Sequence, residues 1–487
     1  MTKKSLSIIL ILILLTLGLA TLATTSGCGA TSSTTSTEDS SSEESEDSSS
    51  TENATELPSM PTGLAATAGN LSVSLSWTEV EDATSYNIYW GTSDSITTDN
   101  ATKIDDITDT SYSHTGLTNG TTYYYILTAI NSVGESDATS AVSATPALSW
   151  TTSTLISTGA AGQFSTIAID SNDKIHIAYY ANYGSGDIGL RYYTNQSGSW
   201  VEETVDTDGI SESISIAVDS DSGIHISYYS TNGYNLKYAY KADDSWTKAT
   251  VDSTGTMGQY NAMAVDSSNS KIHIVYGDVT LGSLKYATNT IGETDTWNRT
   301  IIDSSATGQV HASIALDSNG TAHIAYRQAT STLKYVTGSL NSWSTPVTID
   351  SGGVISDTSI ALDSNNKVHI SYYKGGETKI SYATNTSGSW VADELTDSYC
   401  GSSGKHTSIA LDSSDNIYIS YYKESSTYSA LKIIMNIDDT WDDATIDEDS
   451  DEDGTGKYTS IAIDSTDKIH IAYYQSNGSN LKYAVSD

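Results

Sequence analysis

One short segment recurs along the C-terminal two thirds of the chain. SIALDSNNKVHISYY occupies residues 359–373, and SIAIDSTDKIHIAYY at residues 460–474 is nearly the same. The shared aspartate returns about every 49 residues, a tryptophan keeps the same period, and each unit holds four short apolar runs. Four strands in a unit of about 40 to 50 residues are typical of a β-propeller blade. The aspartates are Asp170, Asp219, Asp266, Asp317, Asp363, Asp412 and Asp464, and the tryptophans are Trp150, Trp200, Trp246, Trp297, Trp343, Trp390 and Trp441.

The two ends of this array indicate that it closes into a ring. The array begins with a tryptophan run at residues 149–157, ahead of the first aspartate run, and the last unit has no tryptophan run after it. A first strand that completes the last blade explains the offset. We therefore predict an all-β fold with a seven-bladed propeller over residues 149–487, in which the aspartate run of each unit is the innermost strand.

Residues 58–146 show a different pattern, in which alternating apolar runs are separated by turn-forming stretches. This pattern predicts a β-sandwich. The segment also resembles a fibronectin type III domain, with Trp77 late in the second strand. LTNGTTY at residues 117–123 is similar to the family's Leu-x-Pro-Gly-Thr-x-Tyr corner, with Asn119 in place of the proline. The resemblance implies that Tyr123 returns its hydroxyl to nearby backbone, and that the domain is a spacer or docking module.

The N-terminus predicts export. Residues 1–27 combine a basic head with a long apolar run, as signal peptides do. The Ser-Gly-Cys that follows resembles the lipobox of bacterial lipoproteins, with Thr25 where leucine is usual, and implies a lipidated Cys28 in the bacterial cell envelope. A plain secretory signal or an uncleaved anchor helix stays open. Residues 28–57 are acidic and rich in Ser and Thr, which predicts a disordered tether. Cys400 has no partner left, so no disulfide framework is expected.

The charge excludes one class of partner. The chain carries 60 acidic and 22 basic residues, for a formal net charge of −38. A nucleic-acid-binding protein needs a basic face that displaces counterions from phosphates. We therefore expect no nucleic-acid partner and membrane contact through the lipid anchor alone. We also expect a monomer.

The residues repeated in every unit are expected to support the blades. Six histidines share one register, with Tyr418 in the seventh unit, and they are spread around a ring instead of converging as metal ligands must. We predict that each histidine is bonded to the turn beside it, that the aspartates cap those turns, and that the tryptophans pack between blades. The histidines are His176, His225, His273, His323, His369 and His470.

Two registers vary between units and are therefore the candidate binding site. One lies six residues before each repeated aspartate, and the other is the second tyrosine position of the next strand. Both are expected at one mouth of the propeller, where aromatic faces with a few polar groups suit a sugar. The first register holds Phe164, Ser213, Tyr260, His311, Asp357, His406 and Tyr458, and the second holds Tyr180, Tyr229, Gly277, Arg327, Tyr373, Tyr422 and Tyr474.

Three functions remain open from the sequence. Non-catalytic binding of a glycan or another surface ligand, for instance in adhesion, is the first. A polysaccharide-acting glycosidase or lyase is the second, although only Asp357 can be placed near the axis where a glycosidase needs two carboxylates. A scaffold for protein partners is the third. Turns such as TNTSGSW (384–390) distantly resemble the Asp-box turns of sialidase-type propellers. Sialidases, however, hold a carboxylate with three arginines, and the arginines here fall in three registers: Arg191, Arg299 and Arg327.

One acidic loop predicts a calcium site. Asp449, Asp451 and Asp453 alternate as the oxygen ligands of calcium loops do. The closing acid of such loops is replaced by Lys457 or Ser460, depending on the type of loop. A solvated acidic loop is the alternative.

Overall fold

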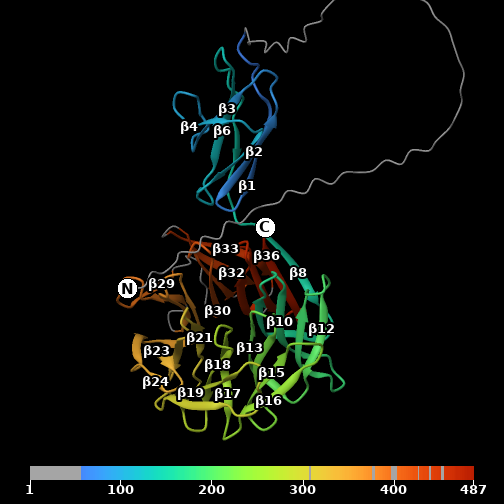
Figure 1. Cartoon of the computed structure of the whole chain (residues 1–487), viewed down its shortest axis with the longest axis vertical. Helices are drawn as coiled ribbons and strands as arrows, with labels where there is room; N and C mark the ends of the chain where they lie inside the picture. The colour runs from blue at the N-terminus through green and yellow to red at the C-terminus, as the bar shows by residue number, and fades with distance from the viewer. Residues whose placement is uncertain are drawn as a thin grey trace, which may run out of the picture. The chain divides into compact units, whose positions relative to one another are not determined.

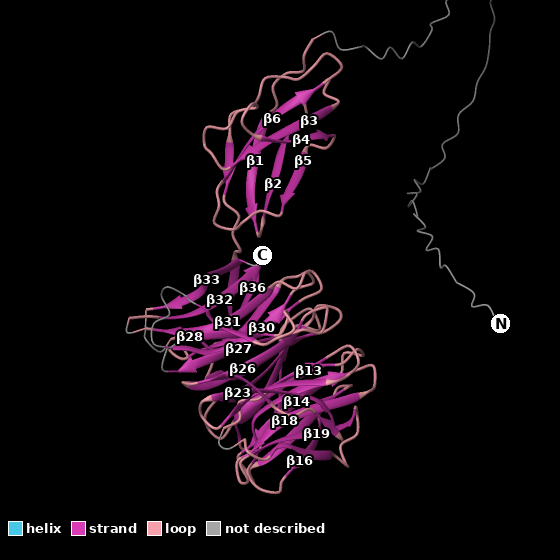
Figure 2. Ribbon diagram, turned by 90° about the vertical axis from the view of Figure 1, so that its left-hand side faces the viewer, coloured by secondary structure: helices cyan, strands magenta, loops and turns pink. Residues whose placement is uncertain are grey.

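The computed structural model describes residues 56–487, apart from residues 307–308, 376–378, 396–402, 426, 438–439 and 451–453. The predicted signal, the lipid site at Cys28 and residues 28–55 of the predicted tether lie outside the described residues, as do Cys400, Asp451 and Asp453. Every regular element in the described part is a β-strand, as Figure 2 shows. Among these residues no helix is long and apolar enough to cross a membrane.

The first strands form the predicted sandwich, which carries the residues expected from the fibronectin type III pattern. The rings of Trp77 and Tyr86 meet edge to face in its core, with centroids 5.3 Å apart. The Thr118 backbone N–H donates to the Tyr123 hydroxyl at 3.0 Å, which confirms the corner. One sheet has the order β1 (Thr62–Gly69), β2 (Ser72–Thr78) and β5 (Ser111–Thr115), and the other β4 (Thr102–Ile107), β3 (Ser85–Gly91), β6 (Tyr123–Ile130) and β7 (Val142–Ala144).

The remaining strands form the seven blades of the predicted propeller, each an antiparallel sheet. Blade 1 consists of β9 (Ala160–Ile169), β10 (Ile175–Asn182), β11 (Ile188–Thr194) and β12 (Val201–Asp206), and blade 2 of β13 (Ile210–Val218), β14 (Ile224–Ser230), β15 (Asn235–Lys241) and β16 (Thr247–Asp252). Blade 3 consists of β17 (Met257–Asp266), β18 (Lys271–Asp278), β19 (Ser283–Thr290) and β20 (Asn298–Asp303). Blade 4 consists of β21 (Ser313–Leu316), β22 (Ala322–Gln328), β23 (Thr332–Ser339), β24 (Ser342–Trp343) and β25 (Val347–Ser351). Blade 5 consists of β26 (Val354–Leu362), β27 (Val368–Gly375), β28 (Lys379–Thr384) and β29 (Val391–Leu395). Blade 6 consists of β30 (Ser403–Leu411), β31 (Ile417–Glu424), β32 (Ser429–Ile437) and β33 (Thr440–Asp449). Blade 7 consists of β34 (Thr455–Ile463), β35 (Ile469–Gln475), β36 (Asn480–Ser486) and β8 (Trp150–Ile156).

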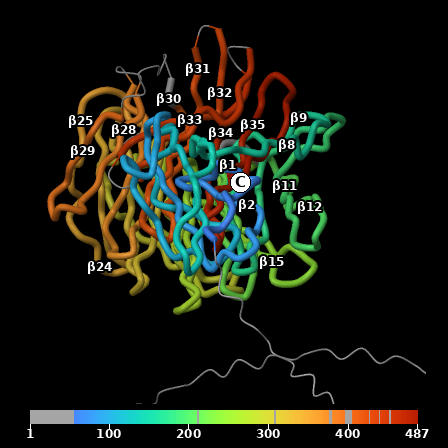
Figure 3. The backbone as a smooth tube through the Cα atoms, turned by 90° about the horizontal axis from the view of Figure 1, so that it is seen from above, coloured from blue at the N-terminus to red at the C-terminus, as the bar shows by residue number. Residues whose placement is uncertain are grey.

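The ring closes as predicted. The outer strand of the last blade is β8, which pairs antiparallel with β36. In Figure 3 the green β8 and β9 accordingly lie beside the red β35. The first strands of successive blades contact one another in order, and β34 contacts β9 to complete the circle. Figure 1 shows β13, β21 and β30 toward the middle of this ring, with β12, β16 and β29 at its periphery.

The repeated aspartates, histidines and tryptophans form a relay of contacts between blades, which confirms their predicted structural role. In blade 2 the Nε2–H of His225 donates to Asp219 Oδ2 at 3.0 Å, and its Nδ1 accepts from the Tyr238 hydroxyl at 2.7 Å. The Tyr238 ring then meets Trp297 of blade 3 edge to face at 5.3 Å. Burial lowers the pKa of His225, although Asp219 acts to raise it, so this imidazole is neutral at pH 7.

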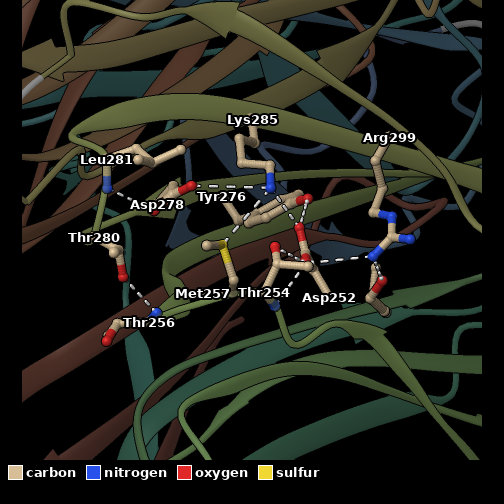
Figure 4. Close-up of polar contacts among 11 residues, drawn as sticks. Asp252, Thr254, Thr256, Met257, Tyr276, Asp278, Thr280, Leu281, Lys285 and Arg299 are labelled. Atoms are coloured by element: carbon tan, nitrogen blue, oxygen red, sulfur yellow. Dashed lines mark hydrogen bonds and ion pairs between the residues drawn. The ribbon is translucent and has the colours of Figure 1, made fainter.

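A second repeated cluster, the inter-blade lock, joins the outer strand of one blade to the next blade (Figure 4). Asp252 Oδ2 accepts from the Tyr276 hydroxyl at 2.8 Å and from Lys285 Nζ at 2.6 Å, and Arg299 Nη1 lies 3.3 Å from its Oδ1. Burial raises the pKa of Asp252, but the bonds from Lys285, Thr254 and Tyr276 outweigh it and lower the pKa to about 2. The same aspartate–tyrosine bond recurs in the pairs Asp206–Tyr228, Asp303–Tyr326, Asp350–Tyr372 and Asp447–Tyr473.

Candidate ligand-binding site

The first variable register coincides with a break in the innermost strand of every blade. All seven residues have positive φ, a conformation that costs energy for any residue with a side chain. In six blades the strand pairing shifts at this point, which marks a β-bulge, and in blade 4 the strand begins two residues after His311. Bulges re-aim side chains. The φ values are 56° at Phe164, 134° at Ser213, 53° at Tyr260, 35° at His311, 51° at Asp357, 57° at His406 and 51° at Tyr458.

The neighbouring blade holds these bulges in place. The Ser165 hydroxyl donates to the Tyr458 carbonyl at 2.8 Å, and the Thr407 hydroxyl donates to the Asp357 carbonyl at 2.5 Å. In each case the donor directly follows the variable residue of the next blade. A backbone carbonyl that has left the strand ladder thereby keeps a partner, and the unfavourable conformation is fixed by tertiary contacts.

The re-aimed side chains contact one another in sequence, and we call the seven of them the inner ring. The rings of Phe164 and Tyr458 lie 4.4 Å apart and those of Tyr458 and His406 lie 4.6 Å apart. Asp357 Oδ1 then lies 3.9 Å from Nδ1 of both His406 and His311. On the far side, His311 stacks on Tyr260 at 3.9 Å. Six of the seven side chains thus form one chain of contacts, and Ser213 is the small seventh.

The charges in the inner ring are fixed by burial and proximity. Burial lowers the pKa of His311 to about 4 and also lowers that of His406, although Asp357 opposes both shifts. Burial raises the pKa of Asp357, but His406, His311 and a 2.8 Å hydrogen bond from Ser356 outweigh it and lower the pKa. At pH 7 the ring therefore presents one carboxylate between two neutral imidazoles, with aromatic faces on either side.

The second variable register lies on the neighbouring strand of each blade, where in five blades it pairs with the residue directly before the ring residue. Tyr180 is half-buried, whereas Gly277 and five residues with side chains are buried, although the sequence places them at an open mouth. Arg327 is one of them, and its guanidinium donates to the carbonyls of Gln309 at 2.6 Å and Ile355 at 3.0 Å. We therefore treat this register as support for the ring and not as an open surface. The buried five are Tyr229, Arg327, Tyr373, Tyr422 and Tyr474.

Two lysines beside the inner ring were missed by the sequence reasoning. Lys405 and Lys457 directly precede the ring residues His406 and Tyr458 on the adjacent strands β30 and β34. Both lysines hold the position directly before a ring residue, but this position alone does not mark the mouth, because Val310 holds it in blade 4 and is buried.

The acidic loop is only partly described. Gln475 Nε2 donates to Asp449 Oδ2 at 3.1 Å. The other two predicted calcium ligands, Asp451 and Asp453, lie outside the described residues, and within these no group of three potential ligands gathers. Calcium binding at this loop stays a prediction.

Comparison with known proteins identifies the family of one domain, the sandwich. Residues 59–145 match the family model of the fibronectin type III domain. The chain is 39% identical over 141 residues to a poly(3-hydroxybutyrate) depolymerase of Ralstonia pickettii, which covers 28% of this chain and 24% of that protein. The chain thus spans about a quarter or less of the curated relatives it matches.

The solved structures that resemble the chain at low sequence identity include two with bound saccharides. One is a polysaccharide lyase bound to a glucuronate-containing saccharide, with a TM-score of 0.48, 12% identity, and coverage of 68% of this chain and 93% of the lyase. The other is the Aleuria aurantia lectin with a fucosylated ligand, with a TM-score of 0.42, 12% identity, and coverage of 59% and 96%.

Proposed function

We propose that the propeller binds a saccharide at the inner ring without transforming it. One observation carries this proposal: six neighbouring blades each place a strained side chain into one continuous set of aromatic, imidazole and carboxylate groups. Sugars combine flat C–H faces with many hydroxyls. Aromatic rings such as Phe164 and Tyr458 offer apolar contact, and Asp357 with its flanking histidines offers hydrogen-bond acceptors.

The proposed setting is the outside of a bacterial cell. A lipid on Cys28 would anchor the chain in the envelope, the acidic tether would extend it, and the sandwich would act as a spacer. Calcium at Asp449, Asp451 and Asp453 belongs to the same proposal.

A second candidate is a polysaccharide lyase. It is favoured by the neutral imidazole of His406, which lies 4.6 Å from the Tyr458 ring, because a neutral histidine and a tyrosine can serve as base and acid in a proton transfer. A two-carboxylate glycosidase is less well supported, since Asp357 is the one carboxylate in the inner ring.

The test is an oligosaccharide array probed with the full chain and two tyrosine variants. Tyr458→Ala should weaken binding by about tenfold or more, because it removes an aromatic contact worth about 1.5 kcal/mol. Tyr234→Ala is the matched control, since Tyr234 also has a positive φ (57°) but lies 56% exposed outside the ring.

The outcomes separate the candidate functions. Binding that survives in Tyr458→Ala would overturn the inner ring as the site, and the lack of binding to any glycan would overturn the proposal and favour a protein scaffold. Release of an unsaturated sugar from a uronate polymer, followed by ultraviolet absorbance, would replace simple binding by the lyase activity.

A further inference from the structure

A groove opens in the outer wall of the propeller at the junction of blades 2 and 3, and we call it the wall groove. It is lined by residues 248–253, in and directly after the outer strand β16 of blade 2, and by residues 294–299, which lead into the outer strand β20 of blade 3. Its volume of about 750 Å³ lies in the range of ligand sites. Strand β16 lies at the periphery of the ring (Figure 1), so the wall groove is separate from the inner ring.

At the junction of blades 1 and 2 the corresponding space is filled by a glutamate. Glu203 of the outer strand β12 pairs with Tyr192. Its carboxylate accepts from two side chains of blade 2, Lys241 Nζ at 2.5 Å and Trp246 Nε1 at 3.0 Å. The two blades are thus joined by side chains at this level of the wall.

At the junction of blades 2 and 3 an alanine holds the place of that glutamate. Ala249 pairs with Tyr238, which is the relay tyrosine of its blade, as Tyr192 is in blade 1. A methyl group cannot reach across to blade 3, and Trp297 Nε1 is accordingly buried without a partner among the described residues. The wall groove therefore exists because this repeat lacks the side chain that closes its neighbour.

Arg299 supplies hydrogen-bond donors to the wall groove. Its side chain is 41% exposed. Nη1 donates to the Val251 carbonyl at 3.3 Å and lies 3.3 Å from Asp252 Oδ1 (Figure 4). Within the described residues these two contacts are the polar contacts of this guanidinium, so Nε and Nη2 keep their N–H groups for another acceptor. The hydroxyls of Thr294 and Thr296 lie in the same lining.

The charges of the lining favour a neutral ligand. Lys248 and Arg299 are its cations, and Asp252 and Asp295 are its carboxylates. Each cation already faces a carboxylate, because Lys248 Nζ lies 2.9 Å from Asp206 Oδ1 and Arg299 contacts Asp252. An acidic ligand would therefore find no unpaired positive charge. A neutral ligand rich in hydroxyls matches the guanidinium donors, the exposed Asp295 carboxylate and the threonine hydroxyls.

We propose that the wall groove is a second saccharide-binding site, which takes one neutral sugar unit with its hydroxyls on Arg299 and Asp295. The site goes beyond the proposed function, because it lies on the wall of the propeller and holds whether or not the inner ring binds a sugar. Two sites on one propeller would hold a glycan-covered surface at two points and raise the overall affinity.

Saturation-transfer NMR of the full chain tests the inference with small sugars. The probes are the methyl glycosides of D-glucose, D-galactose, D-mannose and L-fucose, and methyl glucuronide as the acidic counterpart of the glucoside. We expect at least one neutral glycoside to receive saturation. Its signal should fall to background in Ala249→Glu, because the glutamate of the neighbouring junction then fills the groove, and should persist in Tyr458→Ala. Methyl glucuronide should give no stronger signal than methyl glucoside.

Two further variants locate the effect. Ala444→Glu is the matched control and should leave the signal unchanged. Ala444 pairs with Ile433 in the same register of blade 6, and Trp150 Nε1 of blade 7 is likewise buried without a partner among the described residues. Arg299→Lys keeps a positive charge beside Asp252 but removes the planar fork, so it should weaken the signal several-fold. Thermal melting of each variant checks that the fold is intact.

The outcomes separate the wall groove from the inner ring. A signal that persists in Ala249→Glu, or the lack of a signal from every neutral glycoside, would overturn the inference. A stronger signal from the glucuronide would overturn the neutral ligand class. A signal that is lost in Tyr458→Ala and retained in Ala249→Glu would place the sugar at the inner ring alone, and the proposed function would stand without the second site.

Discussion

Asp357 and Asp363 lie six residues apart in blade 5, yet their surroundings differ. Asp363 Oδ1 accepts from the backbone N–H groups of Asn365 at 2.9 Å and Lys367 at 2.7 Å, and its Oδ2 lies 3.5 Å from His369. Its acceptors are therefore used by its own turn. Asp357 belongs to the varying register, and its Oδ1 faces two imidazoles from neighbouring blades at 3.9 Å. At the scale of single residues, repetition marks support and variation marks the candidate site.

The inter-blade lock gives a prediction at this scale. Tyr326→Phe removes the hydroxyl that donates to Asp303 Oδ2 at 2.6 Å, where Lys334 Nζ also lies 3.5 Å away. A hydrogen bond to a charged group contributes about 1.5–3 kcal/mol, so the free energy of unfolding should fall by that amount in urea denaturation. Tyr234→Phe, at an exposed position, should change it by less than about 0.5 kcal/mol. Equal losses in the two variants would mean that the lock does not stabilise the ring.

At the scale of strands, the innermost strands continue on both sides of the bulges and are therefore longer than the sequence predicts. The sequence predicts a short run such as SIALD, whereas β26 spans Val354–Leu362 because its pairing with β27 resumes beyond Asp357. Without a bulge, the alternation of a strand would turn the ring side chains to the other face of the sheet. The position of Asp357 at the inner ring therefore depends on the bulge as much as on the residue type.

Thr407 tests this dependence. Thr407→Val leaves the Asp357 carbonyl without its 2.5 Å donor in a buried setting, which should lower the free energy of unfolding by about 1–3 kcal/mol. It should also weaken saccharide binding, because Asp357 is no longer held in the ring. Thr407→Ser keeps the hydroxyl and should retain both properties. If the valine and serine variants behave alike in urea denaturation and in titration, the hydroxyl does not fix the bulge.

The limits of prediction from sequence also appear at this scale. Strand number, blade closure and the structural role of the repeated histidines follow from periodicity, which is local and visible. The bulges do not, because the positive φ at Asp357 and at Tyr458 is held by a hydrogen bond from the next blade, from Thr407 50 residues away and from Ser165 293 residues away. Blade 4 shows a simpler case, in which Pro346 falls between β24 and β25 and lacks the N–H needed to continue the outer strand.

At the scale of the whole molecule, the described residues show the lock at five junctions between blades, and the junction between blades 7 and 1 differs from these. Where blade 7 meets blade 1, Ile156 occupies the strand position that holds Asp206 in blade 1. The buried Arg191 instead forms an ion pair with Asp187 of its own blade. Strand β8 therefore closes the ring through its backbone pairing with β36 and through apolar packing, without the lock used at other junctions.

The buried histidines of the relay make the stability of the whole ring depend on pH. Burial lowers the pKa of His176, His225, His323 and His369, and that of His273 to about 4, from an ordinary value of 6.5. Between pH 6.5 and 4 the unfolded chain therefore binds protons that the folded ring does not, so the free energy of unfolding should fall as the pH falls through this window. Asp252 and Asp464, with pKa values of about 2, keep their stabilising charge throughout this pH window and lose the charge only below about pH 4.

Urea denaturation at about pH 7.5 and about pH 4.5 measures how steeply the free energy of unfolding depends on pH. His273→Gln should flatten this dependence because one titrating group is gone. A stability that is constant or rises on acidification between these two values would show that the relay histidines are already protonated in the folded ring.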